Sequence, residues 1–199
     1  MIAATIACAV ACAVLVWAEW RGAKRVRVVA KPCASLAFVA VGVLAGGGRP
    51  WMIVGLALGL VGDLALLGAG KRAFLAGLGA FWLGHAAYVA GIAGVVPPSD
   101  WLQPLALVPA AAGVAALVYL WPHLDTMRVP VIAYVAVIVA MTAGALAAWQ
   151  PRLTPGAVLF FVSDLAVARD AFVARGFSNR AWGLPAYYAG QLLIAWSLA

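Results

Sequence analysis

The sequence has few charged residues, only two histidines and only three cysteines. Lys, Arg, Asp and Glu together make up 10% of its 199 residues, whereas hydrophobic residues make up 67%. Soluble domains contain roughly 45–50% apolar and about 25% charged residues, so this composition excludes an ordinary water-soluble domain. The cysteines show no spacing typical of a zinc site or a disulfide framework. Cys8 and Cys12, four residues apart in an apolar run, are interpreted as small packing residues.

The few charges are mostly basic, with 13 Lys and Arg against 6 Asp and Glu and a formal net charge of +7. Nucleic-acid binders often have such a balance, but here the position of the basic residues favours a different interpretation. Many of them lie between Arg21 and Lys31, directly after the first apolar run. This is the position of a cytoplasmic loop beside a membrane span. We therefore expect membrane lipids around the protein and no nucleic-acid partner.

Apolar runs of about twenty residues, enough to cross the hydrocarbon core of a bilayer, fill most of the chain. We predict an all-α polytopic membrane protein, a bundle of eight transmembrane helices that forms one domain over residues 1–199. Turns rich in glycine and proline separate the helices. Pro32, Pro130 and Pro155 are predicted to lie in first turns, where a missing N–H does no harm. The predicted helices are 2–20, 32–47, 50–69, 73–96, 101–121, 129–148, 155–174 and 183–199.

The basic residues also predict an orientation. All of the 13 Lys and Arg except Arg49 and Arg152 follow the first, third, fifth or seventh predicted helix or, in the case of Arg169, lie near the end of the seventh. Because basic loops remain in the cytoplasm, we predict that both termini are extracytoplasmic and that the protein lies in the inner (plasma) membrane. The first apolar run has no basic residue before it and a basic cluster after it, the reverse of a secretory signal peptide. We expect it to be an uncleaved span.

Few polar side chains interrupt the predicted helices, and each needs a physical reason, because a charge at the bilayer centre costs roughly 2.5–3.5 kcal/mol. Deep in the helices these residues are Asp63, His85, Asp164 and the uncharged Gln191. Because they lie at comparable depths, we predict one polar cavity that opens toward the cytoplasm. The alternatives are protonated aspartates bonded to neighbouring helices and a packing role for His85.

Helical spacing adds residues to the predicted cavity. Gly55, Gly59 and Asp63 recur every four residues, and small residues on one face let another helix approach closely. We expect that face to turn toward the bundle interior. Other polar candidates, near the charged ones or near the helix ends, are Glu19, Lys31, Tyr88, Ser163, Tyr187 and Tyr188. His85 and His123 are the only histidines, and His123 lies in a loop, so we predict no metal and no cofactor.

Five motifs occur in a fixed order along the chain. They are Lys31-Pro32, Gly62-Asp63, Phe74–Leu78 followed by Phe81 and His85–Tyr88, Gly156–Asp164, and Tyr187–Ile194. This pattern resembles the YhhN-like lysoplasmalogenase family of eight-helix membrane proteins, and the resemblance covers essentially the whole chain. One departure is Val29-Ala30 before Lys31, where the family pattern has a hydroxyl residue.

The resemblance implies hydrolysis of the vinyl-ether bond of a lysophospholipid, a lysoplasmalogen, by water. The products are a fatty aldehyde and glycerophosphoethanolamine or glycerophosphocholine. This reaction requires an acid and a base in one pocket, and burial moves the pKa values of paired carboxyl groups apart. We therefore expect Asp63 and Asp164 to be the acid and base, with the assignment open.

Supporting roles follow from the same resemblance. We expect His85, Tyr188 and Gln191 to orient water or the departing glycerol oxygen, and Tyr88 and Ser163 to contact the substrate. Lys31, with an arginine of the first loop, is expected to bind the lipid phosphate. Glu19 is expected to pair with Lys31 or with an amine headgroup, although a solvated salt bridge is the alternative for both residues.

Three other functions are compatible with the residues. Intramembrane Asp, His and Gln residues also serve proton-coupled transporters and channels. A hydrolase of another ether lipid or lyso-lipid would need the same carboxylates. A non-catalytic membrane scaffold would leave those carboxylates without a role.

Overall fold

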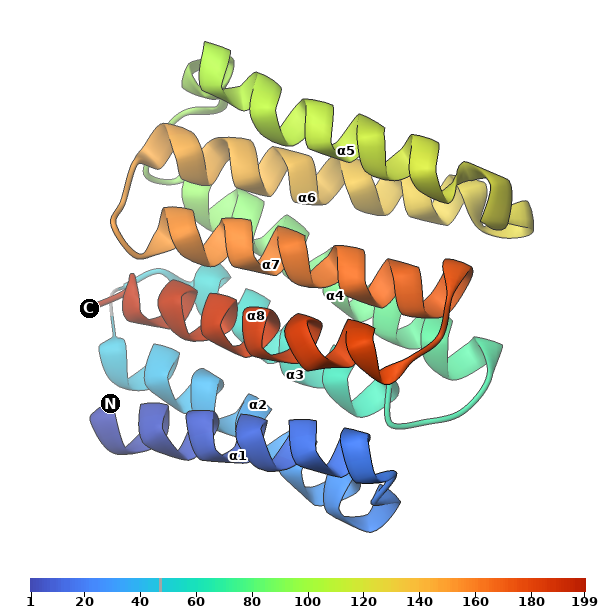
Figure 1. Ribbon diagram of the computed structural model, residues 1–199. Helices are drawn as coiled ribbons and strands as arrows, with labels where there is room; N and C mark the ends of the chain where they lie inside the picture. Colours follow the sequence, from blue (N-terminus) through green and yellow to red (C-terminus); the bar gives the residue numbers. More distant parts are fainter. Residues whose placement is uncertain (47) are drawn as a thin grey trace.

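The computed structural model describes residues 1–46 and 48–199. Within these residues the chain forms eight α-helices and no β-strand (Figure 1). Short 3₁₀ turns flank α5, and a π-helical turn, η5 (Arg169–Val173), continues α7. The helices are α1 (Ile2–Arg21), α2 (Lys24–Ala45), α3 (Pro50–Ala65), α4 (Lys71–Ala93), α5 (Leu107–Leu120), α6 (Arg128–Ala148), α7 (Leu153–Ala168) and α8 (Phe177–Trp196).

Successive helices run in opposite directions, so that both termini lie at the same end of the bundle (Figure 1). The hairpins α1–α2, α3–α4 and α7–α8 pack most extensively, and α8 also contacts α1 and α2. Helix α5 lies at one edge and packs mainly on α6. The loops α1–α2, α3–α4, α5–α6 and α7–α8 form the end opposite the termini, which we call the basic end because most Lys and Arg residues lie there.

Five helical segments are long and apolar enough to cross a membrane. They are Ile2–Arg21, Lys24–Ala45, Lys71–Ala93, Pro104–His123 and Asp125–Ala148. Helix α3 is also apolar but shorter, with 16 residues. Large hydrophobic side chains such as Ile6, Val118 and Val129 are exposed on the outside of the bundle, as a lipid-facing surface requires. The chain is a multi-pass, all-helical membrane protein.

Close helix packing turns Asp63 inward, as the glycine spacing predicts. A Cβ atom at Gly59 would lie 2.5 Å from Gln191 Nε2, and one at Gly55 would overlap the ring of Tyr88. Both glycines are therefore required for the approach of α3 to α4 and α8. Asp63, one turn after Gly59, is 3% exposed.

Two predicted helix starts are wrong. Helix α2 begins at Lys24 rather than at residue 32, and α8 begins at Phe177 rather than at 183, so Pro32 and Pro185 lie inside helices. Each proline removes one backbone hydrogen bond, but the helices continue because the packed neighbours hold the remaining turns. The predicted end of the second helix at residue 47 lies outside the described residues. Pro130 and Pro155 do lie in first turns, as predicted.

The start of α5 also differs from the prediction. It begins at Leu107 rather than at residue 101, because two 3₁₀ turns that start at Pro98 and Pro104 precede it. At the other end of the bundle, α3 ends at Ala65 and α7 ends at Ala168, a few residues earlier than predicted. The earlier end of α3 brings Asp63 closer to the basic end, whereas η5 continues α7 to Val173, close to the predicted end.

The α1–α2 turn positions charged residues for the site. Gly22 has a φ of 66°, a left-handed conformation that favours glycine and ends α1 sharply. Helix α2 then starts at once, and its first turns, which sequence analysis assigned to a loop, carry Arg27 and Lys31 on a helical face. From this face, the Arg27 side chain reaches Glu19 of α1 and the Lys31 side chain reaches Asp63 of α3.

Candidate active site

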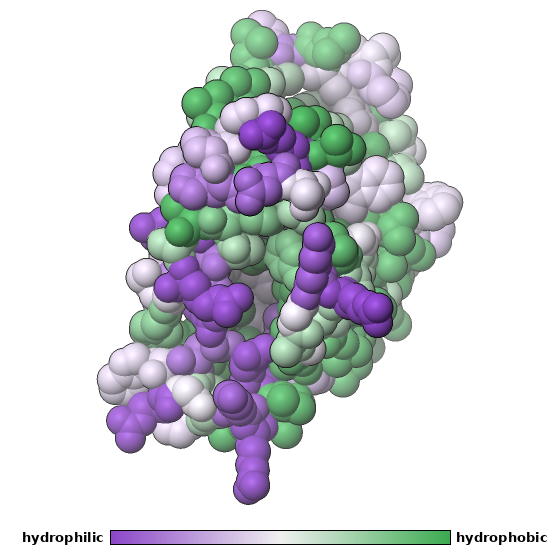
Figure 2. Space-filling view, turned by 90° about the vertical axis from the view of Figure 1, so that its right-hand side faces the viewer, coloured by the Kyte–Doolittle hydropathy of each residue, from purple (hydrophilic) through white to green (hydrophobic). Residues whose placement is uncertain are grey.

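A cavity of about 450 Å³ lies within the bundle at its basic end. Its walls are the last turns of α1, α3, α5 and α7 and the first turns of α2, α4, α6 and α8. Figure 2 shows this end of the molecule, where hydrophilic side chains surround a recess. Both predicted carboxylates, Asp63 and Asp164, line the cavity, and so do Glu19, Lys31 and Ser163.

Asp63 is held by two residues of α2. Lys31 Nζ lies 3.1 Å from Asp63 Oδ1, and the Ser35 hydroxyl donates a hydrogen bond of 2.6 Å to Asp63 Oδ2. Ser35 follows Lys31 by one helical turn, so both side chains reach α3 from the same face. Tyr188 Oη lies 3.4 Å from Ser35 Oγ, behind this pair. A cation and a hydroxyl donor on a buried carboxylate stabilise its negative charge.

Asp164 belongs to a second cluster, where α7 meets α4 and α6. The Tyr134 hydroxyl donates to Asp164 Oδ2 at 3.0 Å, and His85 Nε2 lies 3.2 Å from the same oxygen. His85 Nε2 is also 3.1 Å from Tyr134 Oη. The His85 ring is fully buried, and its centroid lies 4.4 Å from that of Phe160.

The surroundings of His85 determine where its protons lie. His85 Nδ1 is 3.1 Å from Met141 Sδ, and a thioether sulfur can only accept a hydrogen bond, so this contact favours the tautomer with a proton on Nδ1. His85 Nε2 and Asp164 Oδ2 then face each other, and two lone pairs at 3.2 Å would repel. A proton on the imidazole or on the carboxyl group would turn this contact into a hydrogen bond. The geometry therefore allows Asp164 and His85 to share a proton beside the cavity.

Several predicted site residues lie behind the cavity wall rather than in it. Tyr88 donates a hydrogen bond of 2.6 Å to Gln191 Oε1, and Gln191 Nε2 donates to Tyr187 Oη at 3.4 Å. Of these three residues, only Tyr187 lines the cavity. Tyr188 and His85 are likewise buried outside the lining. These side chains hold the lining residues in place.

Ser163 does line the cavity, but its hydroxyl is already engaged. Ser163 Oγ donates to the carbonyl oxygen of Phe160 in its own helix at 2.7 Å. A bond of this kind to the preceding turn satisfies the only proton of the hydroxyl. Ser163 therefore offers the cavity a hydrogen-bond acceptor.

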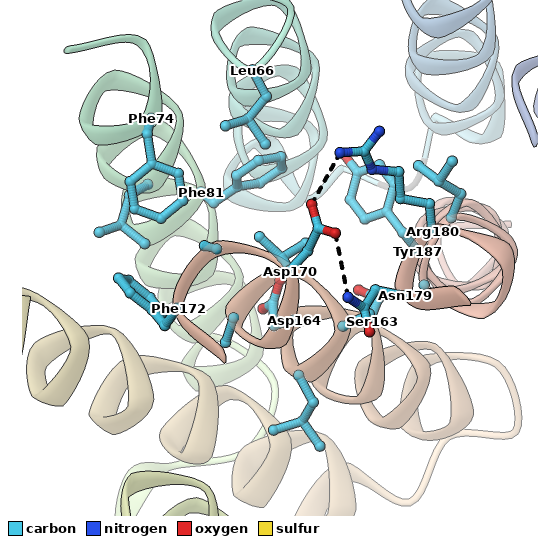
Figure 3. Close-up of a pocket in the computed structure, with 18 of the residues that line it drawn as sticks. Leu66, Phe74, Phe81, Ser163, Asp164, Asp170, Phe172, Asn179, Arg180 and Tyr187 are labelled. Atoms are coloured by element: carbon cyan, nitrogen blue, oxygen red, sulfur yellow. Dashed lines mark hydrogen bonds and ion pairs between the residues drawn. The ribbon is translucent and has the colours of Figure 1, made fainter. Parts of the chain in front are cut away.

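A network of charged side chains lies at the mouth of the cavity, and one ion pair in it differs from the expected one. Glu19 pairs with Arg27 at 3.3 Å and with Arg180 at 2.7 Å, not with Lys31, which reaches Asp63 instead. Arg180 also pairs with Asp170 of η5 at 3.1 Å (Figure 3). The network links α1, α2, η5 and α8.

Asp170 lies beyond the end of α7 and is tied to the loop that follows. It accepts hydrogen bonds from the Gly176 backbone N–H at 2.8 Å and from Asn179 Nδ2 at 3.3 Å. Burial raises the pKa of Asp170, but these two bonds and the Arg180 guanidinium outweigh it and hold the pKa below its usual value. Asp170 is therefore a charged structural anchor near neutral pH.

Sequence analysis missed five residues around the site. Ser35, Tyr134, Met141 and Arg180 contact predicted residues, and Asp170 pairs with Arg180. Two left a signal in the sequence. Tyr134 is the only polar side chain between Arg128 and Thr142, and Ser35 lies one turn after Lys31. The other three depend on helix packing. Within residues 1–46 and 48–199, no three His, Cys, Asp or Glu side chains gather closely enough to hold a metal ion.

Comparison with known proteins places the chain in a family. The sequence profile of the YhhN family matches residues 26–198. The chain belongs to the YhhN family. The family resemblance drawn from the five motifs is thereby confirmed. No solved structure matches the chain significantly.

Three relatives illustrate the similarity. The chain is 32% identical over 170 residues to a lysoplasmalogenase from Mycobacterium tuberculosis, covering 80% of this chain and 64% of the relative. It is 36% identical over 155 residues to lysoplasmalogenase TMEM86B from Mus musculus, covering 76% and 65%. An uncharacterized membrane protein YhhN from Escherichia coli is 29% identical over 154 residues, covering 74% and 73%. This YhhN-family chain thus spans slightly less than two thirds of the length of the mycobacterial and mouse relatives.

Proposed function

We propose that this YhhN-family protein is a membrane hydrolase that cleaves the vinyl-ether bond of lysoplasmalogens. The products are a fatty aldehyde and glycerophosphoethanolamine or glycerophosphocholine. The names of the mycobacterial and mouse relatives support the reaction. The observation that carries the proposal is that Asp63 and Asp164 line one cavity in different surroundings. Asp63 faces a cation, whereas Asp164 lies within hydrogen-bonding distance of His85 and Tyr134.

Vinyl-ether hydrolysis begins with a proton transfer to carbon. The double-bond carbon farther from the ether oxygen takes the proton, and positive charge develops on the other carbon and on the oxygen. Water adds to that carbon and loses a proton, which gives a hemiacetal. The carbon–oxygen bond to glycerol then breaks, the hemiacetal hydroxyl loses its proton, and the glycerol oxygen gains one. One water molecule is consumed.

We assign the acid to Asp164 and the base to Asp63. In this assignment a proton held between Asp164 and His85 passes to the vinyl carbon, and the Tyr134 hydroxyl stabilises the carboxylate that remains. Asp63, kept negative by Lys31 and Ser35, stabilises the cation and takes a proton from the attacking water. General acid or base catalysis of this kind contributes roughly 10²–10⁴-fold in rate.

In this proposal the lipid headgroup binds at the mouth of the cavity. Lys31 is held by Asp63, so we propose that Arg27, the arginine of the expected first loop, meets the lipid phosphate together with Arg180. Glu19, which lies between these two arginines, is the partner for an amine headgroup. Tyr88, Tyr188 and Gln191 then act by positioning Tyr187 and Ser35, and Ser163 contributes an acceptor.

We further infer that all eight helices cross the inner membrane and that the cavity opens to the cytoplasm. The basic end, where the cavity opens, carries residues such as Lys24, Arg25, Lys71 and Arg72. Basic segments of this kind favour the cytoplasmic side, and the two termini lie at the opposite end of the bundle (Figure 1).

The test is aldehyde release from a lysoplasmalogen by the purified protein in mild detergent. A saturated alkyl-ether lyso-lipid serves as the unreactive substrate. We expect Asp63→Asn and Asp164→Asn to lower turnover at least roughly 10²-fold. Asp100→Asn, at an exposed aspartate outside the cavity, should retain full turnover. Full turnover in both site variants would refute the mechanism, and no release by folded wild-type protein would refute the substrate.

A proton-coupled transporter is the second candidate. The adjacent Asp164 and His85 side chains and the buried Lys31–Asp63 pair are also groups that a proton relay uses. A flux assay in proteoliposomes distinguishes the two. Uptake that depends on a pH gradient, without aldehyde release, would favour the transporter.

A further inference from the structure

The cavity has two chemically different sides. The charged residues at its mouth include Glu19, Arg27 and Arg180 from α1, α2 and α8, and Asp170 of η5, which pairs with Arg180. The side formed by α4, α5, α6 and the Phe172 ring of η5 is apolar, and it also includes Phe74, Leu78, Ala116, Leu120 and Val135. Figure 3 shows Phe74 and Phe172 on one side of the cavity, and Asn179 and Arg180 on the other.

The apolar side belongs to a hydrophobic cluster separate from the main core. Leu120, Leu124 and Val131 form this cluster, and Val135 and Phe172 pack against it. The Phe172 ring also meets the Phe74 ring edge to face, with centroids 5.7 Å apart. The cavity is thus lined on this side by side chains that offer water no hydrogen-bond partner, and such a space favours an apolar occupant.

The two sides meet at the reacting groups. Tyr134 of α6 stands among the apolar lining residues Val131, Val135 and Ile138, and its hydroxyl donates to Asp164. A lipid with its phosphate at Arg27 and Arg180 and its chain against α5 and α6 would therefore place the bond between headgroup and chain near Asp164.

We propose that the apolar side of the cavity is the binding site for the hydrocarbon chain of the lipid, and that Ala116 and Leu120 of α5 set the chain length it accepts. The identity of the lipid as a vinyl-ether lysophospholipid rests on the proposed function. The chain site itself rests on the apolar lining and its separate cluster.

The test measures binding without chemistry. The ligands are saturated alkyl-ether lysophospholipids from hexyl to decyl, below their micelle concentrations, with Kd obtained from calorimetry of the full-length protein. Each methylene that enters the site should lower Kd about fourfold. Ala116→Leu adds three carbons to the apolar side, so the decrease in Kd with chain length should stop at a chain about three methylenes shorter than in the wild type. Leu120→Ala enlarges the site, so Kd should continue to decrease for longer chains than in the wild type.

Ala115→Leu is the matched control, because Ala115 is exposed on the outer face of the same helix. Lipid partition into detergent is common to all variants and cancels in the comparison. Equal chain-length dependence in wild type, Ala116→Leu and Leu120→Ala would overturn the proposal. If lysoplasmalogen is not hydrolysed but this dependence is found, the proposed function fails and the chain site stands. Hydrolysis with no dependence on Ala116 or Leu120 would refute the chain site alone.

Discussion

Replacing Lys31 with methionine should leave a buried carboxylate without its cation. Lys31 Nζ lies 3.1 Å from Asp63 Oδ1, and Asp63 is 3% exposed. Removing one partner of a buried ion pair destabilises a protein by roughly 3–5 kcal/mol, whereas replacing both with uncharged residues of similar size is often neutral. We therefore expect Lys31→Met to lower the free energy of unfolding by about 3–5 kcal/mol. The Lys31→Met/Asp63→Asn double variant should recover most of that loss.

The assay is a double-mutant cycle on reversible unfolding of the detergent-solubilised protein. Lys24→Met, at an exposed lysine at the start of the same helix, is the control and should change stability by no more than about 0.5 kcal/mol. The reasoning would be refuted if Lys31→Met were as stable as Lys24→Met. It would also be refuted if the double variant were no more stable than Lys31→Met alone.

Three further outcomes follow from the contacts. Tyr134→Phe removes a hydrogen bond of 3.0 Å to Asp164, so steady-state kinetics should show a kcat lower by roughly 10–100-fold with KM nearly unchanged. Gly59→Ala should destabilise the bundle by about 1–3 kcal/mol through overlap with Gln191, whereas Gly79→Ala, with open space around it, should raise the melting temperature. Because the pKa of Asp170 is lowered in the fold, its stabilising effect should be complete above about pH 4 and lost as pH falls through the folded-state pKa. Asp170→Asn should remove that acid dependence from unfolding curves.

Much of the fold is predictable because apolar length is a strong constraint. Runs of about twenty apolar residues correspond to single helices, and the bounds of α1 and α6 agree closely with those predicted. The errors arise where local rules compete with packing. Proline indicates a helix end in isolation, yet Pro32 and Pro185 lie within α2 and α8, because contacts from adjacent helices compensate for the missing hydrogen bonds.

Several residues of the candidate site can be predicted from the sequence, but the contacts between them are harder to predict. The cost of burying charge identified Asp63, His85 and Asp164. Asp63 and His85 are buried and Asp164 is half-buried, and all three lie in the cavity wall or next to it. Which cation faces which carboxylate depends on the rotation of each helix, which no single sequence specifies. Glu19 therefore faces Arg27 and Arg180 rather than the expected Lys31.

The most direct test of the proposed reaction is the mass of the aldehyde that the protein releases from a lysoplasmalogen in D₂O. The aldehyde is reduced at once to the alcohol, so that later exchange adds no label. Proton transfer to carbon by Asp164 should place one solvent deuterium on the carbon next to the former carbonyl, and Asp164→Asn should release almost no aldehyde. An aldehyde without deuterium, or labelled release that persists in Asp164→Asn, would contradict the mechanism.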